Sequence, residues 1–121
     1  MSILSDTKRA LGLPDEYTPF DLDITIGINA SFLSLTQVGI GPEEGFLIAD
    51  GQTDWGDLLK GNPALEAVKQ YVYLKTRVTF DPPNSSFVLE AMQKTLDELL
   101  WRLNIQVDKG LPDDNVTDSE L

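Results

Sequence analysis

Acidic side chains are the most abundant groups that could take part in chemistry in this chain of 121 residues. The sequence contains 20 Asp and Glu residues, no Cys and no His. The lack of Cys excludes disulfides, thiolate zinc sites and cysteine nucleophiles. The lack of His removes the commonest general base near neutral pH and the commonest transition-metal ligand. Catalysis would have to use Asp, Glu, Lys, Tyr or Ser alone, so the composition argues against an enzyme.

Two short segments could suggest ligand binding, but neither has the required spacing. The glycines between residues 39 and 45 match neither the dinucleotide fingerprint nor the P-loop, and no Gly-Lys-Ser/Thr follows them. The aspartates between residues 50 and 57 lack the alternation and the closing Glu of an EF-hand, so turn and cap chemistry explains them. No pair of carboxylates is marked out for glycoside hydrolysis. The sequence therefore predicts no catalytic residue, no metal site and no cofactor.

The net charge of −11 is unevenly distributed. Residues 1–59 hold ten acids and two bases, residues 60–109 hold six acids and seven bases, and residues 110–121 hold four acids. A net acidic surface disfavours phosphate contacts with nucleic acid. It suits solubility, a wall past which DNA slides without sticking, or a protein that imitates DNA.

The elements that would carry a binding surface begin with a short N-terminal helix. Ser2 is suited to cap this helix, which we expect to end near Leu11. Gly12 supplies a left-handed residue, and Leu13 can make the hydrophobic contact of a Schellman motif. Pro14 prevents the helix from continuing.

Residues 21–38 fit two patterns. Apolar and polar residues alternate in the first part, as in a half-buried strand, but apolar residues also recur at helical spacing. The length of the segment favours a helix, with Asp21 as a suitable N-cap and Gly39 as a suitable C′ residue. We therefore expect a helix, although Gly27 weakens it by about 1 kcal/mol relative to Ala.

Residues 46–53 are expected to form one short β-hairpin or an extended excursion. The apolar residues 46–49 are followed by Asp50-Gly51, which is typical of a tight turn. A single helical turn that contains Trp55 should follow, capped by Thr53 or Asp54.

The residue pattern of the C-terminal half predicts two helices, at about residues 62–79 and 86–107, with Asp81-Pro82-Pro83 between them. Proline ends the first helix, and Ser85 or Ser86 caps the second. The last helix should bury one apolar face, which consists of Val88, Met92, Leu96, Leu99, Leu103 and Val107.

Together these elements predict an all-α (mainly α) fold, a small helical bundle with a C-terminal antiparallel helical hairpin. Residues 1–109 are expected to form a single helical domain, and residues 110–121 a flexible acidic tail. No apolar run approaches the roughly 18 residues needed to span a bilayer, and the N-terminus lacks the pattern of a secretory signal. We therefore expect synthesis in the cytoplasm.

Several runs resemble small head–tail connector (adaptor) proteins of long-tailed bacteriophages. They are YVYLKTR at 71–77, FDPPNSSF at 80–87, EAM at 90–92 and WRLN at 101–104. The upstream arrangement of Gly39-x-Gly41-Pro42, Gly45-Phe46 and Trp55 resembles the same family. The resemblance spans about residues 20–107 and consists of helix breaks, caps and core positions, so it transfers no catalytic residue.

The resemblance implies a structural virion protein at the head–tail junction, the neck, made in the host bacterial cytoplasm. Such adaptors form a ring of usually about twelve copies beneath the portal. The ring extends the DNA channel and docks tail-side neck or stopper proteins. The implied partners are therefore copies of the chain itself, the portal protein and a tail-side neck protein. Genome DNA would pass without specific binding, and no membrane, enzyme activity or cofactor is implied.

Outward-facing aromatic and Arg residues are the candidates for the subunit or portal interface, because such residues anchor protein interfaces. The candidates are Tyr71, Tyr73, Arg77, Phe80, Pro82, Pro83, Phe87, Trp101, Arg102, Phe46 and Trp55. In a head-to-tail ring one patch meets a different patch on the neighbour. The Pro82-Pro83 elbow and the Phe46–Trp55 excursion are the candidates for the two sides, and the isolated chain is expected to be monomeric.

Two other functions remain open at this point. One is a different neck component, such as a stopper or tail-completion protein. The other is an acidic DNA mimic that inhibits a host nuclease. The balanced charge of residues 60–109 argues against the mimic, because a mimic would need acids on those helices too.

Overall fold

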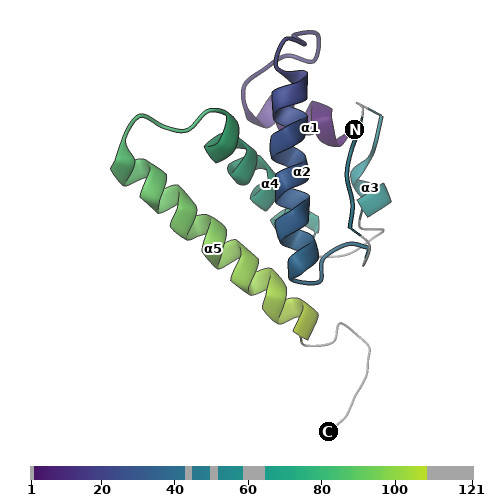
Figure 1. The fold of residues 1–121 in the computed structure, drawn as a ribbon, viewed down its shortest axis with the longest axis vertical. Coiled ribbons are helices and arrows are strands. Elements are labelled where there is room, and N and C mark those ends of the chain that lie inside the picture. Colours follow the sequence, from purple (N-terminus) through teal and green to yellow (C-terminus); the bar gives the residue numbers. More distant parts are fainter. Residues whose placement is uncertain (1, 43–44, 50–51, 59–64, 109–121) are drawn as a thin grey trace, which may run out of the picture.

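The structure, a computed structural model, describes residues 2–42, 45–49, 52–58 and 65–108 (Figure 1). These parts of the chain contain five helices and no strand, which confirms the predicted all-α fold. The helices are α1 (Ile3–Ala10), α2 (Asp21–Gln37), α3 (Trp55–Leu58), α4 (Leu65–Phe80) and α5 (Ser86–Asp108).

The short helix α1 begins and ends as its sequence predicts. The Ser2 side chain accepts a hydrogen bond from the Ser5 backbone N–H at 3.0 Å. At the other end Gly12 adopts φ +83°, and the Leu13 N–H donates to the Lys8 carbonyl at 2.9 Å. This is the Schellman motif, which satisfies carbonyls that the helix leaves free.

Helix α2 confirms the helical interpretation of residues 21–38 and also ends in a Schellman motif. Gly39 adopts φ +89°, and the Ile40 N–H donates to the Leu35 carbonyl at 2.9 Å. The predicted N-cap is displaced by one residue, because Phe20 occupies the cap position without a side-chain cap bond. Asp21 is instead the first helical residue, and its carboxylate pairs with the Lys8 ammonium group at 2.9 Å.

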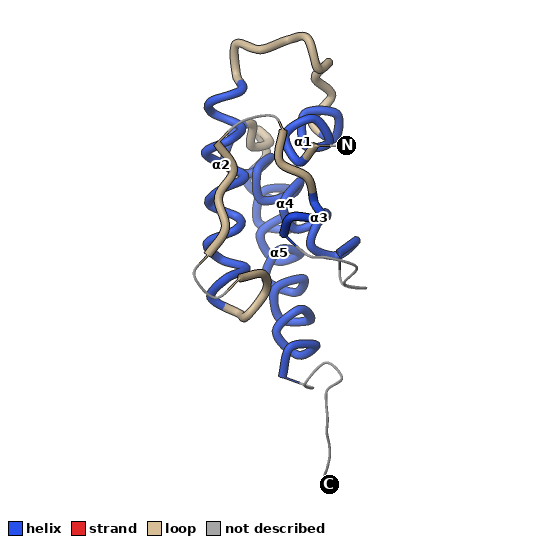
Figure 2. The backbone as a smooth tube through the Cα atoms, turned by 90° about the vertical axis from the view of Figure 1, so that its right-hand side faces the viewer, coloured by secondary structure: helices blue, strands red, loops and turns tan. Residues whose placement is uncertain are grey.

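The bundle is built on the contact between α2 and α4, which is the most extensive one between described elements. α1 packs against both of these helices, and α5 packs against α4. In Figure 2, α2 lies on one side of the molecule and α1 and α3 lie on the other. The core fills the space between α2 and α4 and includes Ile24, Ile28, Phe32, Leu35, Val68, Tyr71 and Val72.

Gly27 permits the close approach of α2 to α4. A Cβ at this position would lie 3.1 Å from Cγ2 of Thr76 and 3.4 Å from its Cα. The helix propensity lost at Gly27 is therefore accompanied by tighter packing between the two main helices of the core.

Of the two alternatives for residues 46–53, the β-hairpin is wrong and the extended excursion is right for the described residues. The turn residues Asp50-Gly51 lie outside them. A side chain takes the place of a partner strand, because the Asn29 amide donates to the Ile48 carbonyl at 3.0 Å and its oxygen accepts from the Ile48 N–H at 2.8 Å. The Ile3 N–H then donates to the Thr53 carbonyl at 2.9 Å. These bonds satisfy extended backbone without a sheet.

The C-terminal helical hairpin is confirmed, with α4 and α5 running in opposite directions in Figure 1. The Ser85 hydroxyl accepts a hydrogen bond from the Val88 N–H at 3.3 Å and so caps α5. The predicted start of the preceding helix, at Asn62, lies outside the described residues. The predicted burial of Val88 is wrong, because the first turn of α5 extends beyond the helix it packs against (Figure 1). Among the predicted residues whose side chains are described, only Leu96 and Leu103 are deeply buried, and the side chain of Val107 lies outside that set.

Candidate interaction surface

The predicted interface residues divide into three groups by exposure. Tyr71 and Trp55 are buried in the core. Four others are half-buried, namely Phe46, Tyr73, Phe80 and Pro83. The remaining five are exposed and free to meet a partner, namely Arg77, Pro82, Phe87, Trp101 and Arg102.

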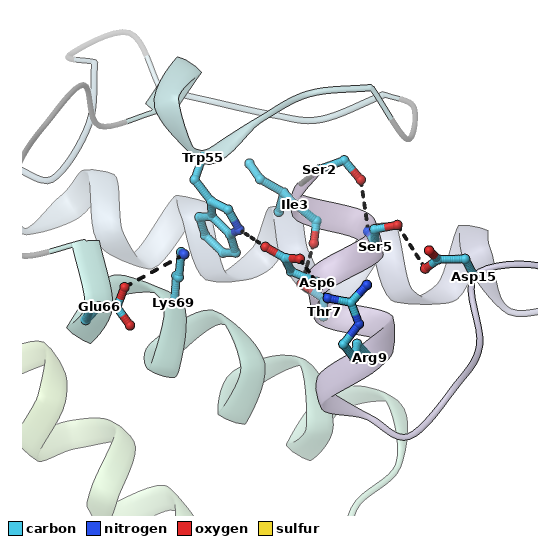
Figure 3. A network of polar contacts seen from close by, with 10 residues as sticks. All are labelled: Ser2, Ile3, Ser5, Asp6, Thr7, Arg9, Asp15, Trp55, Glu66 and Lys69. Atoms are coloured by element: carbon cyan, nitrogen blue, oxygen red, sulfur yellow. Dashed lines mark hydrogen bonds and ion pairs between the residues drawn. The ribbon is translucent and has the colours of Figure 1, made fainter.

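Trp55 fixes the single turn α3 to the rest of the protein. Its side chain is 5% exposed, and its indole N–H donates to the Asp6 carboxylate at 2.8 Å (Figure 3). The Tyr73 ring packs edge-on at a centroid distance of 6.0 Å, and the Lys69 ammonium group lies 5.6 Å from the centroid of the indole. Because the indole is buried and held by these contacts, Trp55 has a folding role in the monomer.

The polar groups around Trp55 form a charged network rather than a reactive site. Arg9 lies 3.8 Å from Asp6, and Lys69 lies 3.8 Å from Glu66 (Figure 3). Burial, reinforced by the negative charges of Asp6 and Glu66, raises the pKa of the Tyr73 phenol above its usual value. The phenol therefore stays protonated at neutral pH and is no general base.

Phe46 and Phe80 tie connecting segments to the helices. The Phe46 ring packs edge-on against Phe32 of α2 at 5.3 Å, and the Phe80 ring packs edge-on against Phe20 at 5.2 Å. Such pairs contribute roughly 0.5–1.5 kcal/mol beyond their buried area. Each ring is half-buried, so one part packs internally while another part remains on the surface.

The outward face of α5 carries the most exposed aromatic side chains. Phe87 is 79% exposed and Trp101 is 64% exposed. They are two heptads apart with Lys94 midway, so all three lie on one face of the helix. That face is opposite the one with Leu96 and Leu103, which is buried. These aromatic side chains contribute little to the core and remain available for binding.

A second apolar surface lies on α2 and was not among the predicted interface residues. Leu22, Ile26 and Leu33 are exposed on one face of the helix, and the exposed Leu47 of the neighbouring excursion lines the same hollow as Leu33. Their helical spacing was visible in the sequence. However, α2 is apolar on two faces, and the sequence does not indicate which face packs on α4.

Two hollows accompany these surfaces. One of about 410 Å³ lies between α2 and the excursion, and it is lined by Leu33, Thr36, Gly45, Phe46 and Leu47. The other, of about 320 Å³, lies between α1, α4 and α5. It brings the predicted residues Tyr73 and Arg77 together with Leu11, Leu74, Met92 and Leu99. Apolar floors with few polar groups suit the side chains of a protein partner.

The described part of the chain offers no grouping of acidic side chains suited to hold a metal ion. Within the same residues, no helix is long and apolar enough to cross a membrane. The fold and its surfaces thus define a small helical protein whose prominent features are exposed apolar surfaces.

A comparison with known protein families shows to which family this chain belongs. A family model described as "Phage connector protein" matches residues 3–110, so the chain belongs to the phage connector protein family. Neither the curated proteins nor the solved structures contain a match to it. Membership identifies a structural protein of the phage head–tail connector, located in the neck of the virion, that associates with other head and tail proteins. The family is structural and not enzymatic.

Proposed function

We propose that this protein is the head-to-tail adaptor of its phage. In this role about twelve copies form a ring beneath the portal. The ring extends the DNA channel and docks the tail-side neck or stopper protein. Membership of the connector family supports this role, and the finer position in the neck is our proposal.

The single observation that carries the proposal is the pair of apolar surfaces on one small chain. The outward faces of α2 and α5 both expose large apolar side chains, among them Leu33, Phe87 and Trp101. Large apolar side chains that are exposed on one face of a helix are typical of sites of protein association. A subunit within a ring needs two surfaces for its neighbours and further surface for its axial partners.

The elbow at Pro82-Pro83 is our candidate for an axial contact with the portal or the tail-side protein. Pro82 and Phe87 are exposed there, at an end of the hairpin that extends from the body (Figure 1). Prolines restrict the backbone, so little conformational entropy would be lost when a partner binds this elbow.

The acidic composition is compatible with a channel through which DNA passes. The chain carries a net charge of −11. A wall with this charge repels phosphates and offers no stable binding site for them.

Mass photometry of the chain mixed with the portal ring from the same genome tests the proposal. We expect the portal to gain the mass of about a dozen subunits, while the chain alone remains monomeric. If the portal gains no mass at micromolar concentrations, the adaptor role is wrong. Binding to a tail-side neck protein instead would then identify a stopper or tail-completion protein. Salt-sensitive binding to a host nuclease would identify a DNA mimic.

A further inference from the structure

A hollow beside the Pro82-Pro83 elbow combines aromatic walls with a carboxylate. This elbow hollow has a volume of about 380 Å³ and is lined by Leu13, Phe20, Phe80 and Asp81. The volume lies within the roughly 300–1,000 Å³ that is usual for pockets that hold small ligands. Asp81 directly precedes the two prolines, so the hollow adjoins the elbow that is our candidate for an axial contact.

Aromatic rings form an accessible part of this surface. Phe20 is 39% exposed, and Tyr17, whose ring centroid lies 5.8 Å from that of Phe20, is 41% exposed. The edge-on contact with Phe80 holds the Phe20 ring at the end of α4. The faces of aromatic rings attract cations, and the stem of a long basic side chain can lie along them.

The carboxylate of Asp81 is available to a ligand. Asp81 is exposed, and within the part of the chain that the structure describes, no ion pair or side-chain hydrogen bond engages its carboxylate. A carboxylate beside aromatic rings suits a guanidinium group, which stacks on a ring and donates two parallel hydrogen bonds to a carboxylate. An ammonium group suits it less well, because it is a compact and strongly hydrated charge.

The surroundings of the hollow add negative charge. Residues 12–24 contain four acids and no base, and the structure describes all of these residues. Each acid lies within three residues of Leu13 or Phe20, and only Asp21 is paired, with the buried Lys8 at 2.9 Å. The acids near the hollow without an ion pair to another described residue are Asp15, Glu16, Asp23 and Asp81.

The neighbouring cations do not compensate this charge. Arg9, at the end of α1, lies 3.8 Å from the Asp6 carboxylate. Arg77, in the last turn of α4, lines the separate hollow between α1, α4 and α5. Lys75 precedes Phe80 by five residues, so it lies roughly 140° away from it around α4. The surface beside the elbow is therefore net negative and favours a positively charged partner.

We propose that the elbow hollow binds an arginine side chain of an axial protein partner. The guanidinium group pairs with the Asp81 carboxylate, and the aliphatic stem lies along Phe20. Nucleic acid does not suit this surface, because the carboxylates would repel its phosphates. The inference rests on the proposed adaptor role and assigns the chemistry of the axial contact at the elbow.

NMR titration of the full chain with the peptide acetyl-Leu-Arg-Leu-amide tests the site. The control peptide carries citrulline, the neutral isostere of arginine, at its centre. We expect the amide signals of Phe20, Phe80 and Asp81 to shift with the arginine peptide and to shift several-fold less with the control. Equal shifts with both peptides, or no shift with either, would overturn the proposal.

Two matched variants test the role of the carboxylate. Asp81→Asn removes the charge and keeps the size of the side chain, and Asp97→Asn makes the same change at an exposed position of α5. Asp81→Asn should weaken binding of the arginine peptide and of the axial partner several-fold, whereas Asp97→Asn should not. If both variants bind the portal ring and the tail-side neck protein as the wild type does, the proposal is wrong.

The outcome is separable from that of the adaptor role. If wild-type chains load onto the portal but the arginine peptide does not bind at the elbow, the arginine site is wrong and the adaptor role stands. If wild-type chains do not load, the adaptor role is wrong, and the peptide titration of the free chain still decides whether the hollow binds arginine.

Discussion

The two tryptophans of this protein lie in opposite environments. Trp55 is 5% exposed, hydrogen-bonded to Asp6 and packed against Tyr73. Trp101 is 64% exposed and projects from the outward face of α5. The same residue type thus stabilises the fold in one region and remains uncovered in the other. The comparison teaches that the side containing α1 and α3 is built for internal stability, whereas α5 is available for assembly.

Replacing each tryptophan by alanine should show the difference between the two regions most clearly. Trp55→Ala should lower the free energy of unfolding by about 3–5 kcal/mol, because it leaves a cavity and removes the hydrogen-bond donor of one Asp6 carboxylate oxygen. Trp101→Ala should change it by less than about 0.5 kcal/mol, as is usual for exposed positions. Urea unfolding followed by circular dichroism measures both values. Similar losses in the two variants would contradict the division of roles.

Lys8 should be the next most sensitive position on the stable side. Its buried ammonium group donates to the Asp15 carbonyl at 2.8 Å and pairs with Asp21 at 2.9 Å. Lys8→Ala should destabilise by about 2–4 kcal/mol, because it removes the packed stem and leaves Asp21 without its cation. Lys94→Ala on the exposed face of α5 is the matched control and should cost less than about 0.5 kcal/mol. Equal midpoints in urea for the two variants would refute this prediction.

Asn29 holds the excursion that forms one wall of the α2 hollow. Asn29→Ala should cost about 1–3 kcal/mol, because the N–H and carbonyl of Ile48 lose their bonds at a position where the side chain is buried. Hydrogen exchange should show faster exchange at the Ile48 amide, with no change at Leu103. The exposed Gln37→Ala serves as the control on the same helix. Unchanged protection at Ile48 would show that the excursion is held in another way.

Tyr73 should give the smallest effect, confined to alkaline pH. Its pKa is raised in the folded state from the usual value of 10.0 by burial and by Asp6 and Glu66. The folded protein therefore holds the phenolic proton more tightly than the unfolded chain. This contribution is complete below the unfolded pKa and is lost as pH rises from that value through the folded pKa. Tyr73→Phe should unfold with a weaker dependence on pH in this window, and an identical dependence would contradict the shift.

Local sequence signals predicted the helix ends well, because the responsible contacts span few residues. Gly12 and Gly39 ended their helices in the left-handed conformation, and Ser2 and Ser85 supplied caps. The Pro82-Pro83 break likewise fixed the hairpin from local backbone restrictions alone. These features need no knowledge of the tertiary structure.

The burial of particular side chains could not be predicted, since it depends on contacts between distant segments. α2 is apolar on two faces, and the close approach of Gly27 to Thr76 selects the face that turns inward. The hydrogen bonds from Asn29 to Ile48 and from Trp55 to Asp6 join residues far apart in the sequence. The aromatic residues therefore suggested a binding surface, but only the structure shows that Trp101 is exposed and Trp55 is buried.

The most direct test of the division between folding and assembly is mass photometry of Trp101→Ala with the portal ring. We predict that this variant unfolds at the wild-type urea midpoint but no longer adds a ring of subunits to the portal. Phe87→Ala, which removes the other exposed aromatic side chain of α5, should still assemble the ring. Wild-type loading by Trp101→Ala at unchanged stability would contradict the account, because the exposed tryptophan would then have no role in assembly.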